Sequence, residues 1–258
     1  MPTFSLKLIN KTSQPWYYFL YQAPLLRQQL TTGNSVIEPI ANSEPVSGSR
    51  SKKSAKAKHA IASIAPVIHP LVWIVSKHKM APNTQYIFTW NDESEFFWYC
   101  QRAIKPGMNF VEKKRSEKRY LAFMKNNVMN SATTFDIVDD TPVFSPAGLG
   151  TNPGSLVISV KSGVCSETYT VGIKMWDRPT MIATAVEQQN LIFSPRYWVS
   201  ASATAPHVGT VLDTTDGKDC GSNLSAPAML IDFPINTNSA TYWLMPRDRE
   251  LPVWQLAS

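Results

Sequence analysis

The chain has 258 residues, of which 43% are hydrophobic and 17% are charged, and its formal net charge is +6. This length can bury a sizeable core, and these fractions are those of a folded protein, which excludes disorder over most of the chain. Its 19 prolines and 11 glycines would interrupt long helices repeatedly, so an all-helical fold is disfavoured.

The N-terminal residues 1–10 lack the charged start and the unbroken apolar run of a secretory signal. No window approaches the ~20 apolar residues that a membrane-spanning helix needs. We therefore expect a cytoplasmic protein, while export without such a signal stays open. Cys100, Cys165 and Cys220 are widely spaced and odd in number. This pattern fits neither a disulfide framework nor a metal site, so we expect reduced thiols.

The first predicted elements are two strands. Phe4, Leu6 and Leu8 alternate with polar residues, which is the period of a half-buried strand. After a turn at residues 10–15, residues 16–22 carry aromatic rings at successive positions. Because successive strand residues point to opposite faces, this pattern predicts a central strand covered on both sides, or one whose outer face contacts a partner.

Residues 42–66 differ in character from their neighbours. A linker-like segment of Ser, Pro and Gly is followed by a basic run, and a short helix could extend over residues 56–64. We interpret residues 42–66 as an insertion or flexible loop in a single domain that spans residues 1–258. Deleting residues 43–58 should leave thermal stability nearly unchanged, because they contain almost no large apolar side chain. The basic residues of this run are Arg50, Lys52, Lys53, Lys56 and Lys58.

Residues 86–90 and 96–99 flank a polar turn, which predicts a hairpin with aromatic cross-strand pairs. The sequence Lys105-Pro106-Gly107 predicts a type II turn, since proline presets the first central position and glycine supplies a positive φ at the second. A second basic run follows at residues 111–119. Within it, the residues assigned to a basic patch are Lys113, Lys114 and Arg115.

The longest stretch of alternating strand and turn signals covers residues 155–200. Residues 156–160 and 167–173 flank a Lys-Ser-Gly break and predict a hairpin, and residues 197–199 predict a strand with two rings on opposite faces. Further short strands are expected at residues 133–138, 209–213, 229–234 and 241–244. This spacing predicts an all-β fold, an antiparallel β-sandwich with a jelly roll as one variant.

The order of these motifs resembles that of the rhizosphere-induced RhiA-like proteins over most of the chain. The exception is residues 43–66, where this chain departs from shorter members of the family. The resemblance implies a small soluble bacterial protein, and it brings no established activity and no catalytic residues. The segments that carry it are residues 8–13, 21–22, 86–90, 96–98, 105–110, 170–175, 193–195, 197–199, 209–213 and 231–234.

Signatures of catalysis and metal binding are weak. There is no HExxH motif, nucleophile elbow or phosphate-binding glycine loop, so we assign no metal, cofactor or catalytic residue and expect no enzyme. Residues 213–219 resemble a calcium loop faintly, but a turn is the simpler interpretation. Asp92, Glu93 and Glu95 could supply paired carboxylates, although a solvated hairpin tip explains them as well. The histidines, which lack zinc-ligand spacing, are His59, His69, His78 and His207.

The two basic runs carry a net charge of about +8, which exceeds the +6 of the whole chain. They could bind an anionic membrane surface, or they could be solvated loops. Nucleic acid is disfavoured because no stacking aromatics are interleaved with the basic residues.

Two hypotheses for function follow. The first is a non-enzymatic β-sandwich that binds a glycan or a lipid, or that self-assembles into a homo-oligomer, through an exposed aromatic surface. The second is a carboxylate-dependent hydrolase. The residues assigned to the aromatic surface are Trp16, Tyr17, Tyr18, Tyr197 and Trp198.

Overall fold

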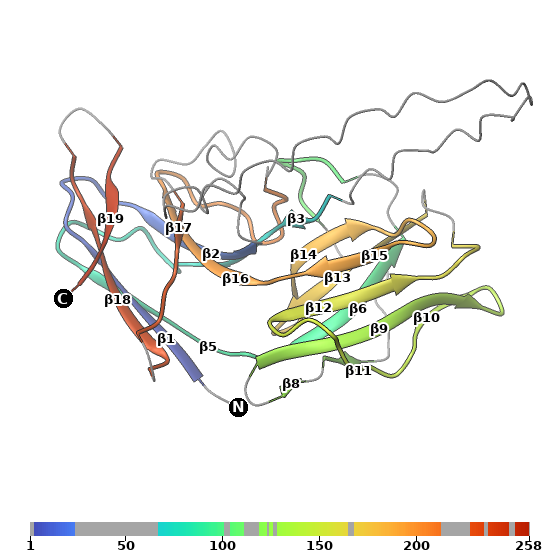
Figure 1. The fold of residues 1–258 in the computed structure, drawn as a ribbon. Coiled ribbons are helices and arrows are strands. Elements are labelled where there is room, and N and C mark those ends of the chain that lie inside the picture. Colours follow the sequence, from blue (N-terminus) through green and yellow to red (C-terminus); the bar gives the residue numbers. More distant parts are fainter. Residues whose placement is uncertain are drawn as a thin grey trace, which may run out of the picture. The chain divides into compact units, whose positions relative to one another are not determined.

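The computed structural model describes residues 3–23, 67–100, 104–110, 119–122, 124–125, 128–164, 168–212, 228–234, 237–247 and 251–257. Met1–Leu25 and Pro66–Ser258 form one compact unit. Its described residues form strands and turns without a helix (Figure 1), which confirms the all-β prediction. The predicted insertion at residues 42–66 and its helix lie outside the described residues.

The first sheet is built around the N-terminal strand. In spatial order its strands are β19 Val253–Leu256, β18 Ser239–Met245, β1 Thr3–Asn10 and β5 Gln85–Asn91. β1 pairs in parallel with β18 and antiparallel with β5. Leu6 and Leu8 are fully buried, as their alternation with polar residues predicts. β19 was not predicted, because residues 241–244 are the last clear strand in the sequence pattern.

The second sheet is antiparallel throughout. In spatial order its strands are β17 Met229–Leu230, β16 Arg196–Ser202, β2 Tyr17–Ala23 and β4 Val72–Val75. Tyr18 and Leu20 face the first sheet across a shared core, whereas Phe19 and Tyr21 pack on the opposite face with Trp198. The prediction that residues 16–22 form a strand covered on both sides is therefore confirmed.

The third and fourth sheets form a second sandwich. Phe96 and Ile173 of the third sheet pack against Leu156 and Phe193 of the fourth. β9 pairs in parallel with β12, and the other pairings are antiparallel. The third sheet contains β3 His69–Pro70, β14 Arg178–Thr184, β13 Tyr169–Met175, β6 Ser94–Cys100 and β7 Tyr120–Leu121. The fourth contains β10 Thr141–Phe144, β9 Val128–Val138, β12 Ser155–Val160 and β15 Asn190–Phe193, with β8 Met124–Lys125 and β11 Gly148–Leu149 beside β9.

Both predicted hairpins are wrong. β5 pairs with β1, whereas β6 pairs with β13 and β7. Likewise, β12 pairs with β9 and β15, whereas β13 pairs with β6 and β14. The physical reason is that alternation defines the two faces of a strand but not its neighbour. β5 packs in the core of the first sandwich and β6 in that of the second, whereas β12 and β13 lie in the two sheets that face each other across one core.

Two of the hairpins that do form have two-residue turns. β9 and β10 join at Asp139 and Asp140, with φ of 49° and 60°, and β13 and β14 join at Trp176 and Asp177, with φ of 51° and 58°. Positive φ at both central residues is the type I′ geometry that suits hairpin twist. The predicted turn at Gly107 is confirmed, with φ of 78°.

The chain crosses between the two sandwiches at three described places. It passes from β3 to β4 at Leu71, from β5 to β6 at Asp92 and Glu93, and from β15 to β16 at Ser194 and Pro195. Two of these crossings line the cavity described next.

Candidate functional site

A cavity of about 330 Å³ lies where the chain crosses between the sandwiches. Its walls come from three of the four sheets and from two crossing segments, so residues far apart in the sequence meet there. The lining combines three aromatic rings with two carboxylates and a guanidinium. These side chains are Phe4, Tyr197, Phe233, Asp92, Asp232 and Arg196.

Asp92 and Tyr197 form the polar centre of the cavity. The Tyr197 hydroxyl donates a hydrogen bond to Asp92 Oδ1 at 2.6 Å. Asp92 is only 8% exposed, and this burial raises the pKa of its carboxyl, while the bond from Tyr197 acts in the opposite direction. Burial also raises the pKa of Tyr197 well above its usual value, with the nearby Asp92 adding to the effect. The pair can therefore accept and donate hydrogen bonds inside an apolar wall.

The aromatic walls are continuous with the core of the first sandwich. The Phe4 ring lies 5.1 Å from that of Phe233 and 5.8 Å from that of Tyr197, measured between centroids. Tyr197 in turn lies 5.1 Å from Trp90, which is fully buried. These contacts hold the rings in fixed orientations, as a preformed binding site requires.

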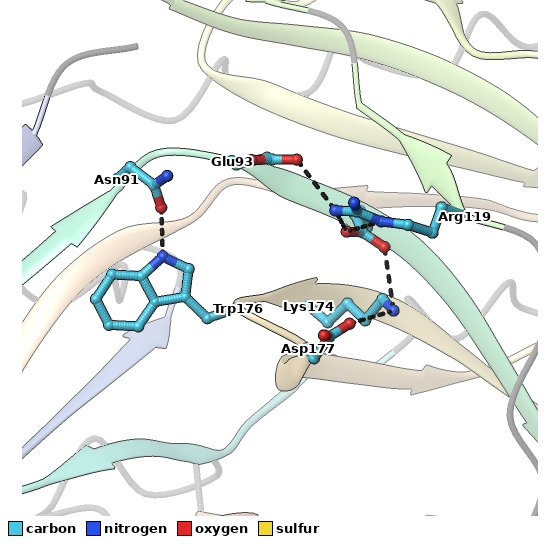
Figure 2. Close-up of polar contacts among 7 residues, drawn as sticks. Asn91, Glu93, Arg119, Lys174, Trp176 and Asp177 are labelled. Atoms are coloured by element: carbon cyan, nitrogen blue, oxygen red, sulfur yellow. Dashed lines mark hydrogen bonds and ion pairs between the residues drawn. The ribbon is translucent and has the colours of Figure 1, made fainter.

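The crossing segment that carries Asp92 is fixed on both sides of that residue. Figure 2 shows Asn91 accepting a hydrogen bond from the indole nitrogen of Trp176, and Glu93 paired with Arg119. Trp176 lies at the tip of the β13–β14 hairpin, and Arg119 precedes β7. Asp92 is thus held between two side-chain contacts from the second sandwich.

A buried ion pair lies next to this segment. Lys174 Nζ is 3.1 Å from Glu95 Oε2, and Arg119 Nε donates to Glu95 Oε1 at 2.8 Å (Figure 2). Burial alone would raise the pKa of Glu95, but the hydrogen bonds and charges of Arg119 and Lys174 outweigh it and lower the pKa below 4.5. Glu95 stays ionised at neutral pH and supports the structure rather than proton transfer.

The predicted aromatic surface is largely internal. Tyr18 is 0% and Trp198 is 3% exposed, so their expected surface location is wrong. The cause is that β2 and β16 are adjacent central strands, and both of their faces are packed. Tyr17 is half-buried, and so is Trp16, whose indole donates to Thr12 Oγ1. Tyr197 is the predicted residue that reaches the cavity.

The predicted solvated carboxylates are also placed differently. Asp92 and Glu95 are buried, because they flank a crossing between sheets instead of a hairpin tip. Sequence reasoning singled out Asp92 but missed the other cavity residues Phe4, Arg196, Asp232 and Phe233. No local signal could have found these, since separate strands bring them together.

The predicted basic patch lies outside the described residues. Its members are Arg50, Lys52, Lys53, Lys56, Lys58, Lys113, Lys114 and Arg115.

In the part of the chain that the structure describes, no group of three or more His, Cys, Asp or Glu side chains could hold a metal ion. Cys100 is a free, exposed thiol. Over the same residues, no helix has the length and apolar character needed to cross a membrane.

A model of the RhiA family matches residues 61–249. The chain belongs to the RhiA family. It is also similar to Protein RhiA of Rhizobium leguminosarum bv. viciae, with 25% identity over 215 residues, which cover 81% of this chain and 71% of that protein. No solved structure matches the chain. The resemblance to RhiA-like proteins is therefore confirmed, and the matched range contains the cavity side chains named above apart from Phe4.

Proposed function

We propose that this RhiA-family protein is a non-enzymatic carbohydrate-binding protein whose cavity accepts one sugar unit of a glycan. The observation that carries the proposal is a nearly buried carboxylate, Asp92, set among the aromatic walls Phe4, Tyr197 and Phe233. Sugars have apolar C–H faces that pack on aromatic rings and hydroxyl groups that need hydrogen-bond partners. The cavity offers both kinds of contact.

The size and polarity of the cavity support a sugar over an acyl chain. Its volume of about 330 Å³ is at the small end of the range for small-molecule sites, roughly 300–1,000 Å³. An acyl chain would leave Asp92 without a partner beyond Tyr197 and would bring no group to pair with Asp232 or Arg196. Leaving polar groups unpaired on ligand binding costs affinity.

A glycan array tests this proposal. We expect the wild-type protein to bind at least one glycan, and Asp232→Ala and Arg196→Ala each to weaken that binding by about tenfold, the loss of one charge-assisted hydrogen bond. Both side chains are exposed at the cavity, so neither change should affect folding. Lys105→Ala is the matched control, because Lys105 is exposed and does not line the cavity. A wild-type protein that binds no glycan on the array would reject the proposal.

The carboxylate-dependent hydrolase is the second candidate. It is favoured by the raised pKa of Asp92, since a general acid must hold its proton near the working pH. The hydrogen bond from Tyr197 favours the ionised form instead, which suits binding. If the protein releases reducing ends from the bound glycan and Asp92→Asn abolishes that release, the hydrolase replaces the binding protein.

Homo-oligomer formation and binding to an anionic membrane stay as predictions from the sequence. Light scattering at tens of micromolar protein measures the first. Pelleting with vesicles of anionic phosphatidylglycerol, compared with vesicles of phosphatidylcholine, measures the second. Only the anionic vesicles should bind a protein through a basic patch.

A further inference from the structure

Trp176 is the aromatic side chain that the described part of the chain leaves most open to solvent. It is 45% exposed, and every other exposed large apolar side chain among the described residues is aliphatic. The aromatic surface that the sequence suggested at Tyr18 and Trp198 is buried, so Trp176 is the ring that the fold presents at the surface.

The backbone at Trp176 is unfavourable for tryptophan. Its φ is 51°, and that of Asp177 is 58°. Such left-handed positions of a type I′ turn favour Asn, Asp or Gly, because a bulky side chain crowds the backbone there. Asp177 fits this preference and Trp176 does not. Strained conformations of this kind concentrate at functional sites. The strain at Trp176 therefore suggests that its side chain has a function.

The ring is held in one orientation. Its indole nitrogen donates to Asn91 Oδ1, and its centroid lies 5.8 Å from that of the fully buried Trp73. Figure 2 shows the indole pointing toward Asn91 from the hairpin tip. A ring fixed in this way loses little conformational entropy when a ligand stacks on it.

The charged groups next to Trp176 are already paired. Asp177 Oδ1 lies 3.4 Å from Lys174 Nζ, and Glu93 Oε1 lies 3.1 Å from Arg119 Nη2. A cationic partner would have to compete with Lys174 and Arg119 for these carboxylates. A neutral ligand with hydroxyl groups can bond to their outer oxygens without breaking the pairs, and its C–H face can lie on the ring.

Trp176 is also close to the cavity. The Trp73 ring contacts both Trp176 and the cavity residue Tyr197, with centroid distances of 5.8 and 6.3 Å. Asn91, which accepts the hydrogen bond of the indole, also directly precedes the cavity residue Asp92. The exposed indole and the cavity are therefore neighbours along the same crossing segment.

We propose that Trp176 is a second carbohydrate subsite, and that this protein binds a neutral oligosaccharide or polysaccharide, with one sugar unit in the cavity and another stacked on Trp176. The inference rests on the proposed function and adds the chain length of the ligand to it.

Titration calorimetry with sugars of different length tests the inference. The probes are glucose with cellotetraose, N-acetylglucosamine with chitotetraose, and galactose with β-1,4-galactotetraose. In Trp176→Asn, we expect the affinity for a tetrasaccharide to fall by about fivefold to tenfold, the usual worth of one aromatic contact, while monosaccharide affinity is unchanged. Trp176→Phe should keep most of the tetrasaccharide affinity, because it keeps a ring.

The possible failures are distinguishable. If the wild-type protein binds none of the probes, the subsite for a neutral oligosaccharide is overturned, and the glycan array decides separately whether the proposed function falls as well. If the wild-type protein binds a monosaccharide and Arg196→Ala weakens it, but Trp176→Asn binds the tetrasaccharide as tightly as wild type, only the subsite is overturned.

Stability separates a binding role from a structural one. Asparagine suits the turn better than tryptophan, so Trp176→Asn should unfold at an equal or higher urea concentration than wild type. A lower midpoint with unchanged tetrasaccharide affinity would identify Trp176 as a clamp on Asn91 and overturn the subsite. If Trp176→Asn does not fold, Asn91→Ala replaces it, because it releases the indole without altering the turn. Unchanged tetrasaccharide affinity in Asn91→Ala would also overturn the subsite.

Discussion

Glu95 and Lys174 form a buried ion pair next to the crossing at Asp92. The side chain of Glu95 is 5% and that of Lys174 is 8% exposed, and their charged atoms are 3.1 Å apart. Glu95→Gln would leave Lys174 buried beside a neutral amide, with Asp177 at 3.4 Å as its remaining carboxylate. Breaking one half of a buried pair costs about 3–5 kcal/mol of unfolding free energy, and we expect the lower end of that range. Urea denaturation near neutral pH measures it, with Glu93→Gln as the more exposed control.

The same variant has a defined pH dependence. The pKa of Glu95 is lowered from 4.5 in the folded protein. A lowered pKa stabilises the fold above the unfolded value, and this contribution is lost as the pH falls through the folded value. The stability difference between wild type and Glu95→Gln should therefore be constant above about pH 5 and shrink below pH 4.5. A stability difference between wild type and Glu95→Gln that grows on acidification would contradict a lowered pKa of Glu95 in the folded protein.

At the scale of elements, Gly172 determines how closely β13 and β14 approach. A Cβ at this position would meet the backbone carbonyl oxygen of Met181 well inside van der Waals contact. Glycine in a strand commonly marks such an approach. Gly172→Ala should destabilise the protein by about 3 kcal/mol, because the partner atom is backbone and cannot move alone. Gly148→Ala, with open space around its Cβ, should change the thermal midpoint little. Equal midpoints for the two variants would refute the packing explanation.

The strands themselves could be predicted, but their neighbours could not. The alternation at Phe4, Leu6 and Leu8 and the proline-glycine turn at Gly107 are local signals, and both are confirmed. The crossing at Asp92 resembles a hairpin tip in sequence, because a polar turn between two aromatic strands is common to both. Which sheet each strand joins depends on contacts with residues far along the chain. The cavity depends on the same crossings, so its residues were mostly missed.

At the scale of the molecule, four sheets account for most of the aromatic content. The sequence suggested more rings than a modest sandwich could hide. Two sandwich cores, together with the outer faces of the second and third sheets, bury aromatic side chains such as Trp73, Trp90, Phe97 and Tyr99. Among the described residues, Trp176 is the aromatic side chain that stays exposed at the surface. A count of rings therefore says more about the number of packed faces than about exposed surface.

The crossings make a prediction about folding as a whole. The Trp73 indole donates to the Met175 carbonyl oxygen at 3.2 Å, and Arg178 donates to the Trp73 carbonyl oxygen at 3.4 Å, so β4 of the first sandwich is bonded to the β13–β14 hairpin of the second. Three strand crossings add covalent links. We therefore expect the two sandwiches to unfold together, as the single domain predicted from the sequence would.

Gly172→Ala provides the test, because it perturbs the second sandwich directly. Tryptophan fluorescence should report mainly on the first sandwich, where Trp73 and Trp90 are buried, and far-UV circular dichroism reports on all the sheets. Since the unfolding is cooperative, both signals should shift to the same lower urea midpoint in the variant. Two transitions, with the fluorescence midpoint left at its wild-type value, would mean that the sandwiches fold independently and that the crossings only tether them.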